Sequence, residues 1–187
     1  KQHRQPFPKE RNMSKGILDV VHSDVWGSTH IATFRGCRYY VTFIHEFSRH
    51  SWIYPMRKKS EVFRHFQRFK NEVEKATSRH VQCLWSDGGN EYFSDDFTAY
   101  LWKEGIRREF SCRHTPQQNG VAKWKNRHIV EVVRAMMYEK NLLKSYWAKA
   151  ANTTIYLMNR LHNLWGTRRN PLLEVFGKRR IYHIPEY

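Results

Sequence analysis

The chain has 187 residues, enough for one well-buried domain and short for two. Its formal net charge is +16 and its pI is about 10.0, a balance expected of a protein that binds a polyanion. No apolar run approaches the length that crosses a bilayer, so we expect a soluble domain with no membrane partner. Basic residues are interleaved with aromatic ones along the whole chain, which favours nucleic acid over a membrane surface.

Residues 1–15 are basic and contain two prolines, and we expect an extended lead-in there. The chain starts without Met, so we expect it to be a piece of a longer protein. The three cysteines (Cys37, Cys83 and Cys112) lack C-x-x-C spacing. This scatter indicates reduced, structural cysteines in an intracellular protein.

The first half of the chain predicts an antiparallel opening to a sheet. Residues 17–24 have the β-branched content of a buried strand. Two more apolar runs, 39–44 and 51–56, are joined by a turn. Residues 62–73 then carry apolar side chains at helical spacing, and Ser60 can cap this helix.

The second half alternates strands and helices. A strand over 81–85 ends at Asp87, which would lie where a parallel strand emits its loop. A helix over 93–102, ended by Gly105, and a strand over 106–110 follow. After a polar loop at 111–120, one helix begins at 121 and another covers 147–161. Periodicity alone predicts an α/β or α+β domain with a mixed sheet.

Three motifs carry a resemblance to a known family. They are His22-Ser23-Asp24-Val25-Trp26-Gly27, Ser86-Asp87-Gly88-Gly89-Asn90-Glu91-Tyr92 and Thr115-Pro116-Gln117-Gln118-Asn119-Gly120-Val121-Ala122-Lys123-Trp124-Lys125-Asn126. Together they closely resemble the integrase catalytic core of copia-type LTR retrotransposons, in which the third motif reads T-P-Q-Q-N-G-V-A-E-R-K-N. The resemblance implies a ribonuclease H-like α/β fold, with a mixed five-stranded sheet flanked by helices.

The resemblance also divides the chain. Residues 1–15 would be the lead-in, residues 16–165 the integrase-like catalytic core and residues 166–187 a C-terminal extension of the core. The family's zinc-binding module would lie upstream. His45 stands where the family commonly has Asp, and Ser28 where it commonly has Pro, which suggests relaxed constraint.

The implied activity is integration of element DNA by a polynucleotidyl transferase that uses Mg²⁺ or Mn²⁺. Such chemistry needs oxygen ligands, and two ions about 3.5 to 4 Å apart can clamp the attacking and leaving oxygens. Asp24 and Asp87 would be the metal-binding and catalytic carboxylates. Taken singly, each is more typical of a turn than of a metal site, but the pair with its flanking motifs is far more specific.

Lys123 stands where the family has its third metal-binding glutamate. A unit charge about 4 Å away, at an effective dielectric near 20, is worth about 4 kcal/mol, so we expect weak or partial metal occupancy. Glu131 lies about 12 Å farther along the helix, and Glu91 already belongs to the family pattern, so we expect neither to substitute. Two functions stay open: an integrase core with impaired catalysis, and a catalytically dead, host-adopted module that binds DNA or protein.

Double-stranded DNA is the implied partner, and the nucleus is the implied location. The residues expected to bind DNA are Gln117, Gln118, Asn119, Lys123, Lys125, Arg127 and Arg134. Lys123, Arg127 and Arg134 share a narrow arc of one helix, as a phosphate-binding stripe or a plain charged face would.

The aromatic residues predict two further contacts. Trp124 replaces a family Arg, and we expect it to be partly buried, with base stacking as the alternative. The resemblance also implies a homodimer or higher multimer that forms through the crossover helix and the last helices. Trp102, Trp147 and Trp165 are candidates for that surface.

Overall fold

The computed structural model describes residues 16–110 and 120–165, with side chains as far as residue 161. The lead-in, most of the polar loop and the C-terminal extension lie outside the described residues. The predicted domain boundaries therefore stay predictions. None of the described helices is long and apolar enough to cross a membrane.

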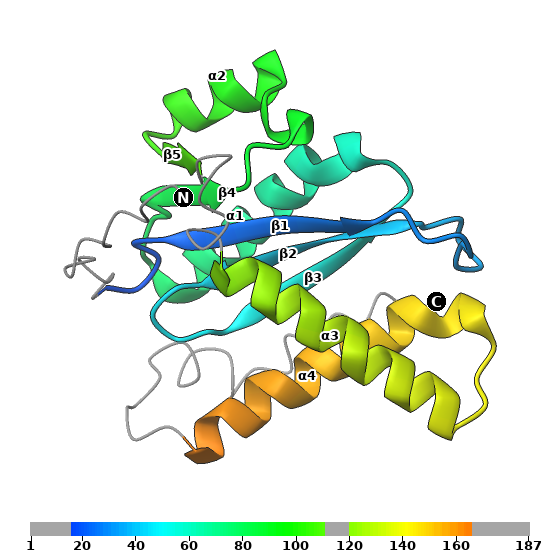
Figure 1. Cartoon of the computed structure of the whole chain (residues 1–187). Coiled ribbons are helices and arrows are strands. Elements are labelled where there is room, and N and C mark those ends of the chain that lie inside the picture. The colour runs from blue at the N-terminus through cyan, green and yellow to red at the C-terminus, as the bar shows by residue number, and fades with distance from the viewer. Residues whose placement is uncertain (1–15, 111–119, 166–187) are drawn as a thin grey trace, which may run out of the picture.

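Five strands form one mixed sheet in the order β3-β2-β1-β4-β5 (Figure 1). The central strand β1 pairs antiparallel with β2 and parallel with β4. At the edges, β3 pairs antiparallel with β2, and β5 pairs parallel with β4. The strands are β1 (Val21–Gly27), β2 (Tyr39–His45), β3 (Ser51–Met56), β4 (Cys83–Ser86) and β5 (Arg107–Phe110).

The first strand begins later than the sequence predicted. A turn occupies residues 17–19, and Leu18 has a φ of 65°. The Asp19 carboxylate accepts a hydrogen bond of 2.7 Å from the backbone N–H of Gly16, which stabilises this turn. Leu18 is nevertheless fully buried. The apolar character of this segment therefore reflects burial and not strand pairing.

Helix α1 (Val62–Thr77) is the predicted amphipathic crossover helix, and it buries Val62, Phe66, Phe69 and Val73. The predicted cap at Ser60 is wrong. Ser60 lies inside a short 3-10 turn, and Glu61 is the residue that precedes α1. The Glu61 carboxylate accepts a hydrogen bond from the Lys58 N–H (3.3 Å), so Glu61 stabilises the start of this turn.

Helix α2 (Asp95–Lys103) begins two residues later than predicted. Ser94 caps it by accepting a hydrogen bond of 3.4 Å from the Phe97 N–H. Gly105 follows the helix with a φ of +66°, the left-handed conformation that glycine adopts without strain.

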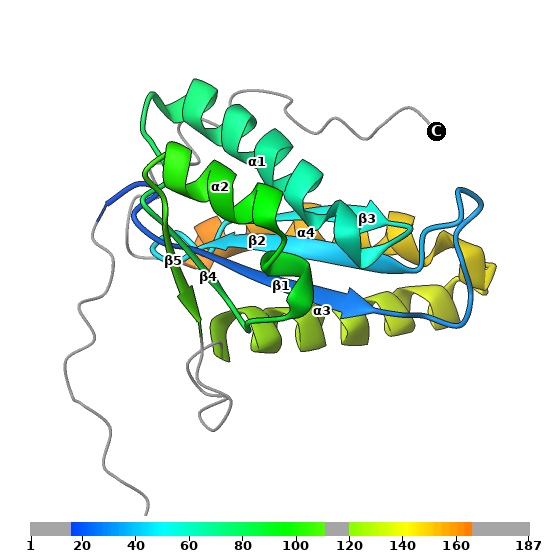
Figure 2. The ribbon, with the colours of Figure 1, turned by 90° about the horizontal axis from the view of Figure 1, so that it is seen from above.

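Helices cover both faces of the sheet (Figure 2). Alternate residues of β2 point to the two faces, because side chains of a strand alternate. Val41 and Phe43 pack with α1 and α2, whereas Tyr40 packs with the last two helices. These are α3 (Gly120–Glu139), which packs on β1 and β2, and α4 (Trp147–Trp165), which packs on β3.

Trp147 does not lie on an exposed surface, so its predicted place in a dimer contact is wrong. Its indole is 7% exposed and packs against Trp26 and Tyr40. The indole Nε1 also donates a hydrogen bond of 3.0 Å to the backbone oxygen of Ile31. Trp102 on α2 is 85% exposed, while the side chain of Trp165 lies outside the described residues.

Candidate active site

The two predicted carboxylates come from neighbouring strands. The sequence predicted Asp24 at the end of the first strand, but Asp24 lies in the middle of β1. The pairing of β1 with β4 ends at His22 and Trp85. Continuing this register by two residues brings Asp24 level with Asp87, the first residue after β4. Asp24 is buried, whereas Asp87 is exposed.

Asp87 is also a turn residue. Its Oδ1 accepts a hydrogen bond of 3.2 Å from the Gly89 N–H. Gly88 between them has a φ of +76°, so a side chain at that position would be strained. The turn fixes the Asp87 backbone and is compatible with the predicted site role of Asp87, which stays a prediction.

Lys123 approaches from the other layer, in the first turn of α3, which packs against β1. Burial raises the pKa of Asp24 to about 6, and a hydrogen bond from Asn126 opposes this effect. The Asp87 carboxylate raises the same pKa, and the Lys123 ammonium lowers it. Asp87 and Lys123 therefore both act electrostatically on Asp24, although Lys123 itself is exposed.

Asn126 and Thr42 are site residues to which the sequence assigned no role. The Asn126 Nδ2 donates a hydrogen bond of 2.8 Å to Oδ2 of Asp24. The Thr42 hydroxyl lies 3.2 Å from Oδ1 of Asn126 and 3.3 Å from the backbone oxygen of Asp24. These contacts orient the Asp24 carboxylate. For Asn126, the signal was its position three residues after Lys123, which places both on one side of α3.

The two carboxylates considered as substitutes have other environments. Glu91 forms an ion pair with Lys59 at 3.3 Å. Glu131 is exposed, more than two turns beyond Lys123 on α3. Within residues 16–110 and 120–165, no group of three His, Cys, Asp or Glu side chains could hold a metal ion.

The predicted DNA-binding residues separate into three groups. Lys123, Arg127 and Arg134 are exposed on α3. Lys125 is only 8% exposed, so its burial does not fit the predicted role on the DNA-facing surface. Gln117, Gln118 and Asn119 lie outside the described residues.

Trp124 is 65% exposed, so the expected partial burial beside the helix is wrong. The arc of α3 that faces the sheet is occupied by Ala122, Lys125, Asn126 and Ile129. Trp124 lies about 200° around the helix from Ala122 and from Asn126, and therefore faces solvent.

His45, which replaces a family Asp, is buried inside the turn region at the end of β2. Its Nε2 accepts a hydrogen bond of 3.0 Å from the Leu18 N–H, and its Nδ1 lies 2.7 Å from the Ser48 hydroxyl. Burial lowers the pKa of His45 to about 4, so the ring is neutral near pH 7. Its contacts are structural.

No family model matches the chain. Retrovirus-related Pol polyproteins of plant transposons are similar to it over nearly its whole length. The chain is 40% identical over 198 residues to the Pol polyprotein of transposon TNT 1-94 from Nicotiana tabacum, with 100% of the chain covered. For transposons RE2 and RE1 of Arabidopsis thaliana, the identities are 35% and 34%, each over 95% of the chain. The chain belongs to the copia-type retrotransposon integrase family.

This integrase core spans only 15%, 12% and 12% of the lengths of those three polyproteins.

Solved structures confirm the ribonuclease H-like fold of the integrase core. A chain of the simian T-cell lymphotropic virus intasome, in complex with the PP2A regulatory subunit B56 gamma, superposes with a TM-score of 0.68 at 17% identity. That match covers 100% of this chain and 63% of the other.

The HTLV-2 integrase catalytic core in complex with magnesium is similar in its trimeric and dimeric forms. The TM-scores are 0.55 and 0.56, and the identities are 15% and 16%. Each match covers 77% of this chain, and 86% or 88% of the HTLV-2 chain. At these identities the likeness shows the fold alone.

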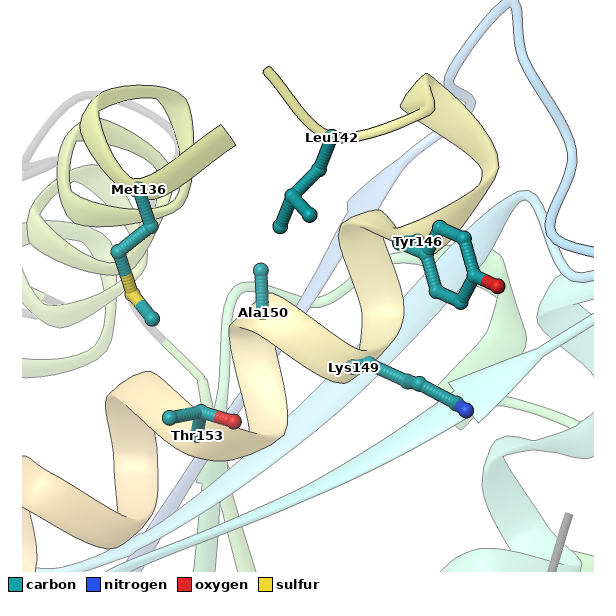
Figure 3. Close-up of a pocket in the computed structure, with 6 residues that line it drawn as sticks. All are labelled: Met136, Leu142, Tyr146, Lys149, Ala150 and Thr153. Atoms are coloured by element: carbon teal, nitrogen blue, oxygen red, sulfur yellow. The ribbon is translucent and has the colours of Figure 1, made fainter. Parts of the chain in front are cut away.

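A hollow of about 220 Å³ lies between the integrase core's last two helices (Figure 3). Its lining is Met136, Leu142, Tyr146, Lys149, Ala150 and Thr153. Met136 is 13 residues beyond Lys123, about 20 Å along α3, so the hollow is separate from the acidic pair.

Proposed function

We propose that the chain is a DNA-binding integrase core whose metal-dependent strand transfer is impaired by Lys123. The proposal rests on one observation: the Lys123 ammonium acts on Asp24 from the position where the family has a carboxylate. A positive charge there repels divalent cations and supplies no oxygen ligand.

The residues present do not fit a site for two metal ions. Asp24 has one carboxylate oxygen engaged by Asn126, and Asp87 supplies the second carboxylate. The described residues offer no third acidic ligand beside them. One weakly held Mg²⁺ or Mn²⁺ is the most that this pair supports.

The chain's own residues still suit DNA. Lys123, Arg127 and Arg134 are exposed along α3 in a chain with a net charge of +16. Phosphate contacts by such residues give tight, largely sequence-independent binding at low salt. This function would require that the protein work in the nucleus, where element ends and target DNA meet.

The second candidate is a catalytically dead module, adopted by a host for DNA or protein binding. Lys123 favours it, because a chain with no selection for catalysis tolerates a lost ligand. The two candidates differ in whether the unmodified protein shows any metal-dependent activity.

The test is restoration of the missing ligand. Lys123→Glu removes a repulsive charge and adds two oxygen ligands beside Asp24, so we expect Mn²⁺ affinity to rise by at least tenfold in calorimetric titration. Lys123→Gln removes the charge without adding a carboxylate, and should give a smaller gain. Arg127→Glu has the same change of charge one turn farther along α3 and should give none.

A strand-transfer assay then separates binding from catalysis. We expect weak Mg²⁺- or Mn²⁺-dependent product from the unmodified chain and more from Lys123→Glu, whereas no product from the unmodified chain would favour the dead module. Robust activity of that chain, abolished by Asp87→Asn, would show that Lys123 does not impair the site.

A further inference from the structure

Trp124 is a large aromatic side chain exposed on the solvent side of α3. It follows Lys123 directly in the first turns of α3, and 65% of its surface lies in solvent. The buried arc of α3 holds it outward, so no rotation of the helix can hide the indole without exposing Ile129 and Asn126. Large apolar rings kept in solvent commonly mark binding sites.

The indole is backed on one side by a second ring. Trp124 and His128 lie one helical turn apart, with ring centroids 5.5 Å apart and planes inclined by 12°. In this parallel pair, His128 packs against one face of the indole, and the pair presents a flat aromatic surface. A flat ring in solvent is suited to stacking with another flat ring.

The charges beside Trp124 indicate which kind of flat ring would stack on it. Lys123 and Arg127 flank Trp124 on the helix surface, and both are exposed. Cations next to an open aromatic face are the combination with which proteins bind unpaired nucleotides: phosphates contact the cations and bases stack on the ring. A purely apolar protein partner would leave these two charges without a counterpart.

We propose that the Trp124 ring, backed by His128, is a stacking site for an unpaired base of a DNA strand whose phosphates lie against Lys123 and Arg127. This inference rests on the proposed DNA-binding function and adds to it the nucleotide-binding surface. The base would lie on the solvent side of α3, opposite the face on which Asn126 contacts Asp24.

The test compares two labelled duplexes of the same sequence, one blunt and one with a three-nucleotide single-stranded overhang, by fluorescence anisotropy without metal. Stacking of one base is worth about 1–3 kcal/mol, so Trp124→Ala should weaken binding of the tailed duplex by roughly tenfold. Its effect on the blunt duplex should be under twofold. Trp124→Phe should retain most of the preference for the tailed duplex, and Trp124→Leu should lose it.

Trp102→Ala is the matched control. Trp102 is the same residue type, is 85% exposed and lies on α2, across the sheet from α3. It should leave binding of both duplexes unchanged.

Three results would overturn the inference alone: equal loss for both duplexes in Trp124→Ala, no loss for either, or equal behaviour of the Phe and Leu variants. Failure of the unmodified chain to bind either duplex would instead overturn the proposed function, and the inference with it. A lower mass of Trp124→Ala by light scattering would assign the ring to a protein contact.

Discussion

Lys125 carries a buried positive charge, and this has a measurable cost. Burial lowers the pKa of Lys125 to about 8, and the charge of Arg49 adds to the effect. In the unfolded chain the pKa returns to the ordinary 10.5. Between pH 8 and 10.5 the unfolded chain therefore binds more protons at this residue than the folded chain. Its contribution to stability rises with pH through that window, and the full cost applies below it.

Lys125→Met should accordingly stabilise the protein. A shift of this size corresponds to roughly 3 kcal/mol, because one pKa unit is about 1.4 kcal/mol. We expect urea unfolding at pH 7 to show a gain of this order, and the difference between the two proteins to shrink from pH 8 to 10.5. Lys140→Met, in which an exposed lysine is changed, should leave the free energy of unfolding within about 0.5 kcal/mol. A pH-independent difference would rule out burial of the charge as its cause.

The same residue shows where the sequence could not predict the site. The sequence predicts Lys125 on the DNA-binding surface, as one of several basic residues in α3. In this helix the apolar residues Val121, Ile129 and Val132 predict the inward face only approximately. In its first turns, the helix in fact directs Asn126 inward, because Asn126 hydrogen-bonds with Asp24 and Thr42. A polar interior contact leaves no trace in apolar periodicity.

At the scale of elements, the strands with alternating or continuous apolar residues were predicted closely. Strands β2 and β3 match the predicted ranges to within one residue. The shorter β4 and β5 start one or two residues later than predicted, because their apolar flanking residues Val81 and Ile106 are buried without pairing. The predicted start of β1 is wrong for the same reason. Burial and strand pairing produce one apolar signal, and the sequence does not separate them.

The side chain of Asn159 hydrogen-bonds helix α4 to the edge strand β3. Oδ1 of Asn159 accepts a hydrogen bond of 2.9 Å from the Ser51 N–H, and its Nδ2 donates one of 2.8 Å to the Ser51 oxygen. Asn159 is 4% exposed. The amide therefore satisfies both backbone groups of the first residue of β3, which water cannot easily reach.

Asn159→Ala should leave those two buried backbone groups without their partner. The expected loss is about 1–3 kcal/mol in free energy of unfolding, measured with urea. Asn152→Ala on the same helix, at a half-buried position, should cost less than half as much. Hydrogen exchange of the Ser51 amide should also accelerate in the first variant. Unchanged exchange at Ser51 would show that this contact does not hold the helix to the strand.

At the scale of the whole molecule, the burial of Trp147 moves the predicted dimer contact elsewhere on the last helices. Leu157 and Leu161 are 44% and 52% exposed and lie one turn apart on α4. Two neighbouring leucines in solvent on one helix face suit contact with a second copy of the chain. We propose that self-association uses this face of α4.

Leu157→Glu/Leu161→Glu should then give a monomer in light scattering at protein concentrations where the unmodified chain is dimeric. The reason is that two carboxylates would be buried without partners in the contact. Trp102→Glu, which places one charge on α2, should stay dimeric. The reverse pattern would assign the contact to α2, and a monomeric unmodified chain would exclude the dimer.

The net charge of +16 should make DNA binding sensitive to salt, and this sensitivity should depend on which face of the molecule carries the charge. Binding of duplex DNA should weaken steeply as the salt concentration rises, because each phosphate contact releases about 0.9 counterions. If Lys123, Arg127 and Arg134 each contact a phosphate, the triple change to Gln should reduce the slope of log affinity against log salt by about 2 to 3.

The control removes the same charge from the opposite layer, through the triple Gln variant of Arg64, Arg68 and Lys75 on α1. A non-specific effect of net charge would weaken binding equally in both variants, because both have a net charge of +13, three below the chain's +16. A DNA-binding face on α3 predicts instead that the α1 variant keeps nearly the full slope. The slopes can be measured by fluorescence anisotropy from about 50 to 200 mM salt, a range over which about 6 to 10 phosphate contacts change affinity by orders of magnitude. Equal slopes for the two variants would assign the binding to overall charge and not to α3.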